Sequence, residues 1–161
     1  MSSGKVSKLV SDGSVGGYTL AGRRVLLVRD DLKHPADLYT VATDGRDLKQ
    51  VTHLNASRLK ITQMGDVRSF TFKGWNNETV QGYVVSPVDY KAGRKYPVAL
   101  IIHGGPQGAM NNDWSYRWNP QTYAGQGFAV VTINFHGSTG YGQAFTDSIS
   151  GDWGGKPLED L

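Results

Sequence analysis

The sequence predicts an α/β fold, and three features of residues 96–142 lead to that prediction. Two short apolar runs, 98–102 and 128–133, have the length and unbroken hydrophobicity of strands buried on both faces of a parallel sheet. A helix is expected between them, because Asn119-Pro120 is a typical helix start and Gly127 a typical stop. Strand, helix and strand in this order predict a βαβ unit with a right-handed crossover, its helix ending near Gln126.

Length and composition narrow the class of protein. A chain of 161 residues has room for about one domain. With 39% hydrophobic and 19% charged residues, it has the composition of a globular protein. The formal net charge is +3 and the basic residues are scattered, so nucleic acid is not expected as a partner. No apolar run approaches the roughly 18 residues of a membrane span, and the first residues lack the apolar core of a signal peptide.

The first half of the chain reads as short antiparallel strands. Strands are expected at 18–20, 24–28 and 38–41, with residues 30–35 as the connection between the last two. The segment 36–52, with Asp44-Gly45 as a hairpin turn, has the pattern of two outer strands of a β-propeller blade. A second strand pair is expected at 64–72 and 79–85, joined by a turn at 74–77.

A glycine pair directly after the first apolar run is the best candidate for chemistry. The loop reads His103-Gly104-Gly105-Pro106, and glycine lets the backbone approach a ligand with no Cβ in the way. We expect the backbone N–H of Gly105 to face a developing negative charge, as an oxyanion-hole donor does, with His103, Gly104 and Pro106 shaping the loop. The alternative is that this loop is only a turn that ends a strand.

The other candidate sites are weaker. His34, His53 and His136 have no acidic or histidine partner at the spacing of metal ligands, so they are interpreted as surface or loop histidines. With no cysteine in the chain, neither a metal site nor a cofactor is expected. Asn55 and Asn77 each begin an Asn-x-Ser/Thr triplet, which is a glycosylation site only in a chain that enters a eukaryotic secretory route.

The sequence contains no recognisable nucleophile for acyl transfer. A nucleophile elbow has the pattern Gly-x-Ser-x-Gly, and no serine of this chain fits it. Ser138 comes nearest, with Gly140 after it but His136 before it. The chain therefore has an oxyanion-type loop without the group that would attack a substrate.

Four separated motifs follow one another in the second half of the chain: His103-Gly104-Gly105-Pro106-Gln107, residues 114–120, residues 134–142, and residues 152–157 with Glu159-Asp160-Leu161. Through these motifs, residues 96–161 resemble the catalytic domain of the prolyl oligopeptidase family of serine peptidases, in particular its dipeptidyl-peptidase V and acylaminoacyl peptidase branch. One departure is His136, where relatives usually carry Arg before Gly-Ser-Thr-Gly.

This resemblance implies an architecture and an activity. Residues 1–62 would be the end of a β-propeller, and 63–161 the N-terminal part of an α/β-hydrolase domain, truncated before the nucleophile elbow. The parent would be a secreted exopeptidase that releases dipeptides or acylated residues from peptide N-termini. Of its machinery only Gly105, as oxyanion donor, and His103, as the side chain that braces its loop, carry over. None of the Ser, Asp and His of the triad would be present, so this chain alone is expected to be inactive.

A second hypothesis is a non-catalytic fragment that binds peptides or a partner protein. The reason for it is the unfinished sheet, whose open edge is expected at the second apolar run, 128–133, and would favour association. The sequence leaves the oligomeric state open.

Overall fold

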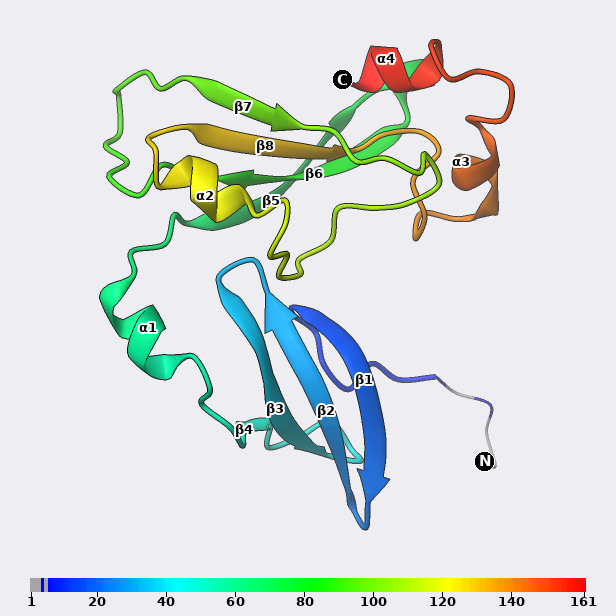
Figure 1. Ribbon diagram of the computed structural model, residues 1–161. Helices are drawn as coiled ribbons and strands as arrows, with labels where there is room; N and C mark the ends of the chain where they lie inside the picture. Colours follow the sequence, from blue (N-terminus) through cyan, green and yellow to red (C-terminus); the bar gives the residue numbers. More distant parts are fainter. Residues whose placement is uncertain (1–3, 5) are drawn as a thin grey trace. The chain divides into compact units, whose positions relative to one another are not determined.

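The computed structural model describes residues 4 and 6–161, and the chain divides into two compact units (Figure 1). The first unit comprises Met1–Thr62 and Asn112–Arg117, and the second comprises Gln63–Asn111 and Trp118–Leu161. The short stretch Asn112–Arg117 thus belongs to the first unit although it lies between two elements of the second. The identification of these units as a propeller end and a hydrolase part stays a prediction.

The first unit is a four-stranded antiparallel sheet in which each strand pairs with the next. Its strands are β1 (Ser14–Ala21), β2 (Arg24–Asp31), β3 (His34–Ala42) and β4 (Lys49–Gln50). The three predicted strands are confirmed, but the expected connection at 30–35 was too long, because only Leu32 and Lys33 separate β2 from β3. The Asp31 carboxylate accepts the backbone N–H groups of Lys33 and His34, which stabilises this tight turn.

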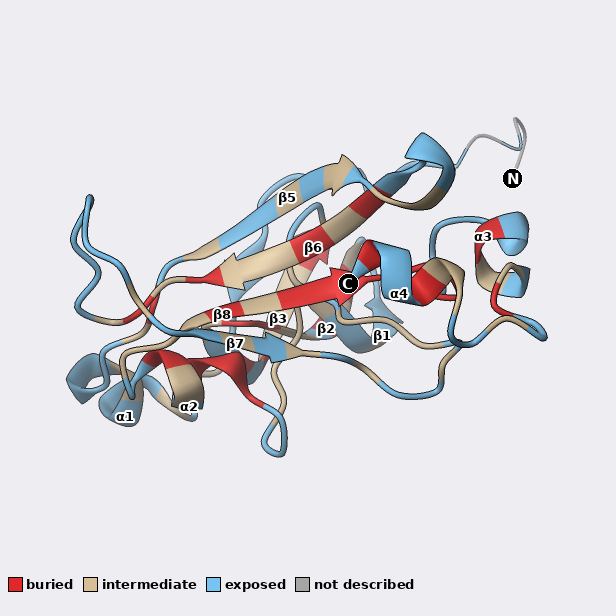
Figure 2. Cartoon of the chain, turned by 90° about the horizontal axis from the view of Figure 1, so that it is seen from above, coloured by how far each residue is buried: buried red, intermediate tan, exposed pale blue. Residues whose placement is uncertain are grey.

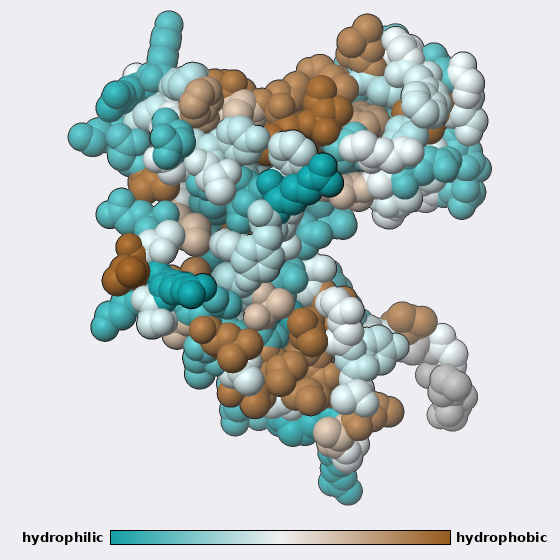
Figure 3. Space-filling view, in the orientation of Figure 1, coloured by the Kyte–Doolittle hydropathy of each residue, from teal (hydrophilic) through white to brown (hydrophobic). Residues whose placement is uncertain are grey.

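One face of this sheet carries a small core and a shallow apolar groove. Val25, Leu27 and Val41 are buried there. Figure 3 shows apolar side chains gathered over the strands of this unit, in the lower part of the view. The groove has a volume of about 370 Å³ and is lined by Leu9, Val10, Val15, Tyr18, Leu20, Val25 and Leu27. The short helix α1 (Ala56–Ile61), which the sequence did not lead us to expect, follows the sheet and buries none of its residues.

The second unit is a mixed sheet with the strand order β5-β6-β8-β7. Its elements are β5 (Val67–Lys73), the 3₁₀ turn η1 (Trp75–Asn77), β6 (Thr79–Val85), β7 (Val98–Ile101), α2 (Pro120–Ala124) and β8 (Ala129–Asn134). Strand β7 pairs with β8 in parallel, whereas β6 pairs antiparallel with both β5 and β8. The predicted strand, helix and strand are confirmed. The Asn119 side chain caps α2 by accepting the N–H of Gln121, and the helix ends at Ala124, two residues before the expected Gln126.

The two apolar runs differ in burial, which corrects the sequence-based interpretation. Strand β8 lies between β6 and β7, and its Val130 is fully buried (Figure 2). Strand β7 is an edge strand whose Val98 is 63% and Leu100 41% exposed. The predictions that both runs are buried and that the open edge lies at 128–133 were therefore wrong. The apolar pattern is the same in both strands, because it records which residues tolerate burial and not how many neighbours a strand has.

Two further short helices, α3 (Gln143–Asp147) and α4 (Lys156–Asp160), follow β8. Phe145 of α3 and Ile149 just after it are buried, the latter in a cluster with Val80, Ile133 and Phe135. Within the described residues, no helix is long and apolar enough to span a membrane.

Candidate active site

The candidate site lies where β7 and β8 end. Because these strands are parallel, their carboxyl ends meet at the same edge of the sheet, where α/β folds usually place their ligand sites. The loop after β7, residues 102–111, therefore lies against the loop after β8, residues 135–142. A backbone hydrogen bond of 2.8 Å from Thr139 N–H to the carbonyl of Gly108 joins the two loops.

His103 holds the first loop to the second. Its Nε2 lies 2.9 Å from the hydroxyl oxygen of Ser138, and its ring stacks on Phe135 with the centroids 4.4 Å apart. Its Nδ1 lies 3.0 Å from the carbonyl oxygen of Gly104. A carbonyl only accepts, so a neutral ring carries its proton at Nδ1 and accepts the Ser138 O–H at Nε2. This geometry is that of a bracing side chain.

The backbone at Gly105 has a conformation that favours glycine. Its φ is +133°, and a Cβ there would lie only 3.0 Å from the nitrogen of Gln107. The Gly105–Pro106 peptide bond is cis. Both Gly104 and Gly105 are exposed, and among the described residues no acceptor takes the N–H of Gly105. The N–H is thus free for an outside acceptor, and the role of oxyanion donor stays a prediction.

Asn134, which the sequence analysis did not single out, fixes the far end of the first loop. Its side chain is 1% exposed; Oδ1 accepts the N–H of Met110 at 2.8 Å, and Nδ2 donates to the carbonyl of Met110 at 3.0 Å. Nδ2 also lies 2.7 Å from Oε1 of Gln81 and 2.9 Å from the hydroxyl of Tyr141. The one sequence signal for this role of Asn134 was its position as a polar residue at the end of an apolar strand.

Tyr141 completes this polar network. Its hydroxyl donates to Oε1 of Gln81 at 2.5 Å. Burial raises the pKa of Tyr141, partly offset by the hydrogen bond from Asn134 and assisted by the nearby Tyr83. The hydroxyl therefore stays a neutral donor, which Gln81 requires.

Comparison with known proteins finds similarity to one family of peptidases. Residues 114–161 match the model of the prolyl oligopeptidase family. The chain is 37% identical over 159 residues to dipeptidyl-peptidase 5 of Arthroderma otae, and 38% identical over 161 residues to that of Trichophyton schoenleinii. These alignments cover 96% and 98% of this chain and 22% of each relative. The chain is therefore similar to a part of dipeptidyl-peptidase 5, and its residues 114–161 match the prolyl oligopeptidase family.

Solved structures of acylaminoacyl peptidases have the same fold over this part. One from Pyrococcus horikoshii superimposes with a TM-score of 0.84 at 26% identity, over 99% of this chain and 25% of its own. Another, in complex with Z-Gly-Gly-Phe-chloromethyl ketone, gives a TM-score of 0.79 at 27% identity, over 91% of this chain and 22% of its own. The chain thus spans about a quarter or less of the length of these members of the prolyl oligopeptidase family.

Ser138 has only one feature of a catalytic serine. Its hydroxyl lies within hydrogen-bond distance of a histidine, as a catalytic serine's does. However, Ser138 is 0% exposed, so a substrate carbonyl has no access to its oxygen. Ser138 is therefore part of the brace that holds His103.

His136 lies in a loop, as one part of the prediction had it, but it is buried and not on the surface. It is 1% exposed, with Nδ1 2.7 Å from Oδ2 of Asp160 and Nε2 3.3 Å from Oε2 of Glu78. These partners lie 24 and 58 positions away in the sequence, beyond the reach of a search for local spacing. His34 and His53 are exposed, and His34 pairs with Asp31 at 2.8 Å.

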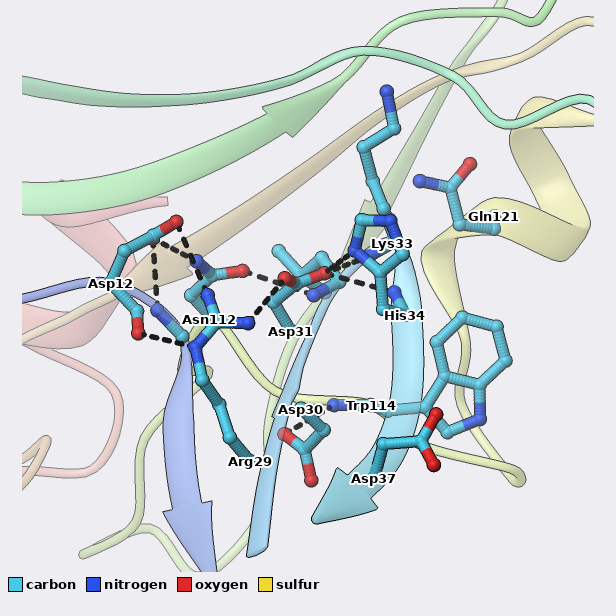
Figure 4. A network of polar contacts seen from close by, with 12 residues as sticks. Asp12, Arg29, Asp30, Asp31, Lys33, His34, Asp37, Asn112, Trp114 and Gln121 are labelled. Atoms are coloured by element: carbon cyan, nitrogen blue, oxygen red, sulfur yellow. Dashed lines mark hydrogen bonds and ion pairs between the residues drawn. The ribbon is translucent and has the colours of Figure 1, made fainter. Parts of the chain in front are cut away.

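A separate polar network ties Asn112–Arg117 to the strands of the first unit (Figure 4). The Asn112 side chain accepts the backbone N–H of Leu32 at 3.0 Å and donates to the Asp12 carboxylate at 2.9 Å. The backbone N–H of Trp114 donates to the Asp30 carboxylate at 3.2 Å. Burial, with the nearby Asp30 carboxylate second, raises the pKa of Asp113. These contacts are structural.

The remaining predicted sites stay predictions. Asn77 is exposed in the η1 turn, whereas Asn55 is half-buried where α1 begins, so Asn77 is the more accessible glycosylation candidate. Across residues 4 and 6–161, no group of three or more His, Cys, Asp or Glu side chains is arranged so that it could hold a metal ion.

Proposed function

We propose that this chain is part of a serine-type exopeptidase that releases dipeptides or acylated residues from peptide N-termini. The observation that carries the proposal is the braced loop after β7, with its unpaired N–H at Gly105 and the side chain of His103 held by Ser138. Such an N–H stabilises the negative charge of a tetrahedral intermediate, and loss of one donor typically costs about a hundredfold or more in kcat. The peptide substrate follows from relatives named dipeptidyl-peptidase and acylaminoacyl peptidase.

The proposal assigns the two units to two parts of such an enzyme. The antiparallel meander of the first unit supports a β-propeller blade, and the mixed sheet with its parallel pair supports the beginning of an α/β-hydrolase domain. The attacking serine and its partners would come from outside this sequence. The chain alone would then be inactive, since its Ser138 is buried. We propose secretion as well, on the weaker ground of the exposed triplet at Asn77.

A labelling experiment in the organism that encodes this sequence tests the activity. A biotinylated fluorophosphonate, which reacts with activated serines, is applied to cells and to culture medium, and captured proteins are digested with trypsin. We expect recovery of the tryptic peptide 74–91, and its recovery from the medium would support secretion. If enzymatic deglycosylation converts Asn77 of that peptide to aspartate, Asn77 carried a glycan. Capture in which this peptide is absent, although the protein is expressed, would contradict the proposed chemistry.

The purified chain of 161 residues provides the complementary test. We expect no hydrolysis of a dipeptidyl or an acyl-alanyl chromogenic substrate. Turnover that a serine-directed phosphonate blocks would show that a serine of this chain is the nucleophile, against the burial of Ser138. Stable binding of unmodified peptides without turnover would instead support the binding-fragment hypothesis.

A further inference from the structure

His136 lies between two carboxylates in the second unit. The Asp160 side chain is 0% exposed and the Glu78 side chain 47% exposed, so one partner is buried and the other reaches solvent. The three residues come from different segments: the loop after β8, the end of α4, and the residue after η1. This cluster takes no part in the chemistry proposed above.

The hydrogen bonds around the cluster determine the charge of the ring. Besides Nδ1 of His136, Asp160 accepts the backbone N–H of His136 at 2.6 Å and that of Trp75 at 2.9 Å. Asp160 thus has three donor groups around it. Glu78 places a second acceptor at Nε2. An ionised carboxylate only accepts, so both ring nitrogens are satisfied only when both carry a proton.

The surroundings of the ring are aromatic. Phe145 stacks on it with the centroids 4.2 Å apart, and Trp75 meets it edge-on at 5.5 Å. Lys156 lies over Trp75 and is paired with Asp152, and Tyr141 packs on Phe145. The other charged groups of the two adjacent helices are Asp147 of α3 and Glu159 of α4, both exposed.

We propose that His136 is held as an imidazolium and acts as a proton-dependent clasp that joins the η1 turn, the loop after β8 and α4. Nδ1 faces a buried partner at 2.7 Å, whereas Nε2 faces a half-exposed one at 3.3 Å. As the pH rises, the proton at Nε2 is therefore the one that leaves. The contact with Glu78 is then lost and that with Asp160 is kept. The clasp is closed at the lower pH and opens on the η1 side as the pH rises.

The clasp also bears on the loop that carries Gly105. His136 is two residues before Ser138, whose hydroxyl holds His103. Release of Glu78 changes the charge and the contacts at the start of this Gly-Ser segment. The state of the clasp is thus linked through the chain to the brace of the loop.

Nitrogen NMR of the histidine side chains in the 161-residue chain tests the proposal. Signals are followed from about pH 5 to about pH 9, a range around the titration of free histidine. We expect both ring nitrogens of His136 to be protonated at the low end, and Nε2 to lose its proton on titration while Nδ1 keeps its own. Once divided by the intrinsic rate, which itself rises with pH, amide exchange at Asn77 and Glu78 should increase about tenfold or more in step, as expected when a hydrogen bond between charged groups is removed.

Two variants distinguish the clasp from general packing. Glu78→Gln removes one charge at a half-exposed position, so the protein is expected to fold. The pH-dependent rise in exchange relative to the intrinsic rate should then disappear. Glu159→Gln is the matched control, because this acid lies exposed on α4 and makes no contact with His136; it should leave the titration unchanged. A His136 ring that carries one proton throughout the range, or that loses the Nδ1 proton first, would overturn the proposal. So would a Glu78→Gln protein whose turn still opens as the pH rises.

Discussion

The side-chain amide of Asn134 binds both backbone polar groups of Met110, with its Oδ1 on the N–H and its Nδ2 on the carbonyl. The Asn134 amide thus makes the two backbone hydrogen bonds with Met110 that a neighbouring strand would otherwise make. It holds the loop after β7 against the end of β8. This loop carries Gly105, so the position of the candidate oxyanion donor depends on a residue that would not touch the substrate.

Asn134→Leu should destabilise the second unit. The leucine has the same branched arrangement of side-chain heavy atoms as asparagine but leaves the N–H and carbonyl of Met110 without partners, and an unsatisfied buried polar group costs about 1–3 kcal/mol. Urea unfolding should show a loss of free energy of unfolding in that range. Asn111→Leu is the control, because Asn111 is exposed, and should change the free energy by about 0.5 kcal/mol or less. Equal effects of the two substitutions would show that the amide of Asn134 does not hold the loop.

Gly137→Ala should be far more damaging than Gly140→Ala. Both glycines have a positive φ, +111° and +94°, so each alanine carries a similar backbone strain of about 1 kcal/mol. A Cβ on Gly137 would also lie 2.8 Å from the Cβ of Ile149, whereas nothing lies within 4 Å of one on Gly140. The melting temperatures of the two variants compare backbone strain alone, in Gly140→Ala, with strain plus a steric clash, in Gly137→Ala. A larger loss for Gly140→Ala would contradict the packing of Ile149 against the loop.

The sequence predicted the parts of this fold that depend on local pattern. The apolar run at 128–133, the cap at Asn119 and the turn at 74–77 each contain their own signal within a few residues, and the structure confirms them. The glycine pair at Gly104-Gly105 could also be predicted, because a positive φ, which Gly105 has, favours glycine.

The other features depend on contacts between distant residues. His136 has no local signal for its burial, since Asp160 and Glu78 reach it only through the fold. Asn134 was likewise hidden, because its partner Met110 lies in a loop of irregular sequence. The edge position of β7 could not be predicted from its own residues, because strand order is a property of the whole sheet.

Asp37 should make the stability of the first unit depend on pH. Burial raises the pKa of its carboxyl, but hydrogen bonds from Thr52, Leu54 and Gln50 outweigh burial, so the pKa is lowered. A lowered pKa stabilises the fold above the pKa of the unfolded chain, about 3.9, and this contribution is lost as the pH falls through the folded value.

Thr52→Val tests this prediction, because it removes the hydroxyl that donates to Asp37 at 2.5 Å. The variant should lose about 1–2 kcal/mol at pH 7. Its deficit relative to the natural protein should shrink below about pH 4, where protonation removes the acceptor charge in both. Thr19→Val, at an exposed position on β1, should show no such pH dependence. Thr52 also accepts the backbone N–H of Leu38 at 2.9 Å, so a deficit that is constant from pH 7 to pH 3 would mean that Thr52 acts through that hydrogen bond and packing and not through Asp37.

Val130→Ala and Val98→Ala test the different burial of two neighbouring strands. Val130 of β8 is 0% exposed in a cluster with Val85 and Ala124, and Val98 of β7 is 63% exposed. Removing two methyl groups from a packed position costs about 2 kcal/mol, because hydrophobic transfer and the resulting cavity both contribute. The same change at an exposed position costs about 0.5 kcal/mol or less. Chemical denaturation of the 161-residue chain should give these two values. Equal losses would mean that the outer face of β7 is covered in solution, for example by a second copy of the chain, in which case the loss at Val98 should decrease on dilution.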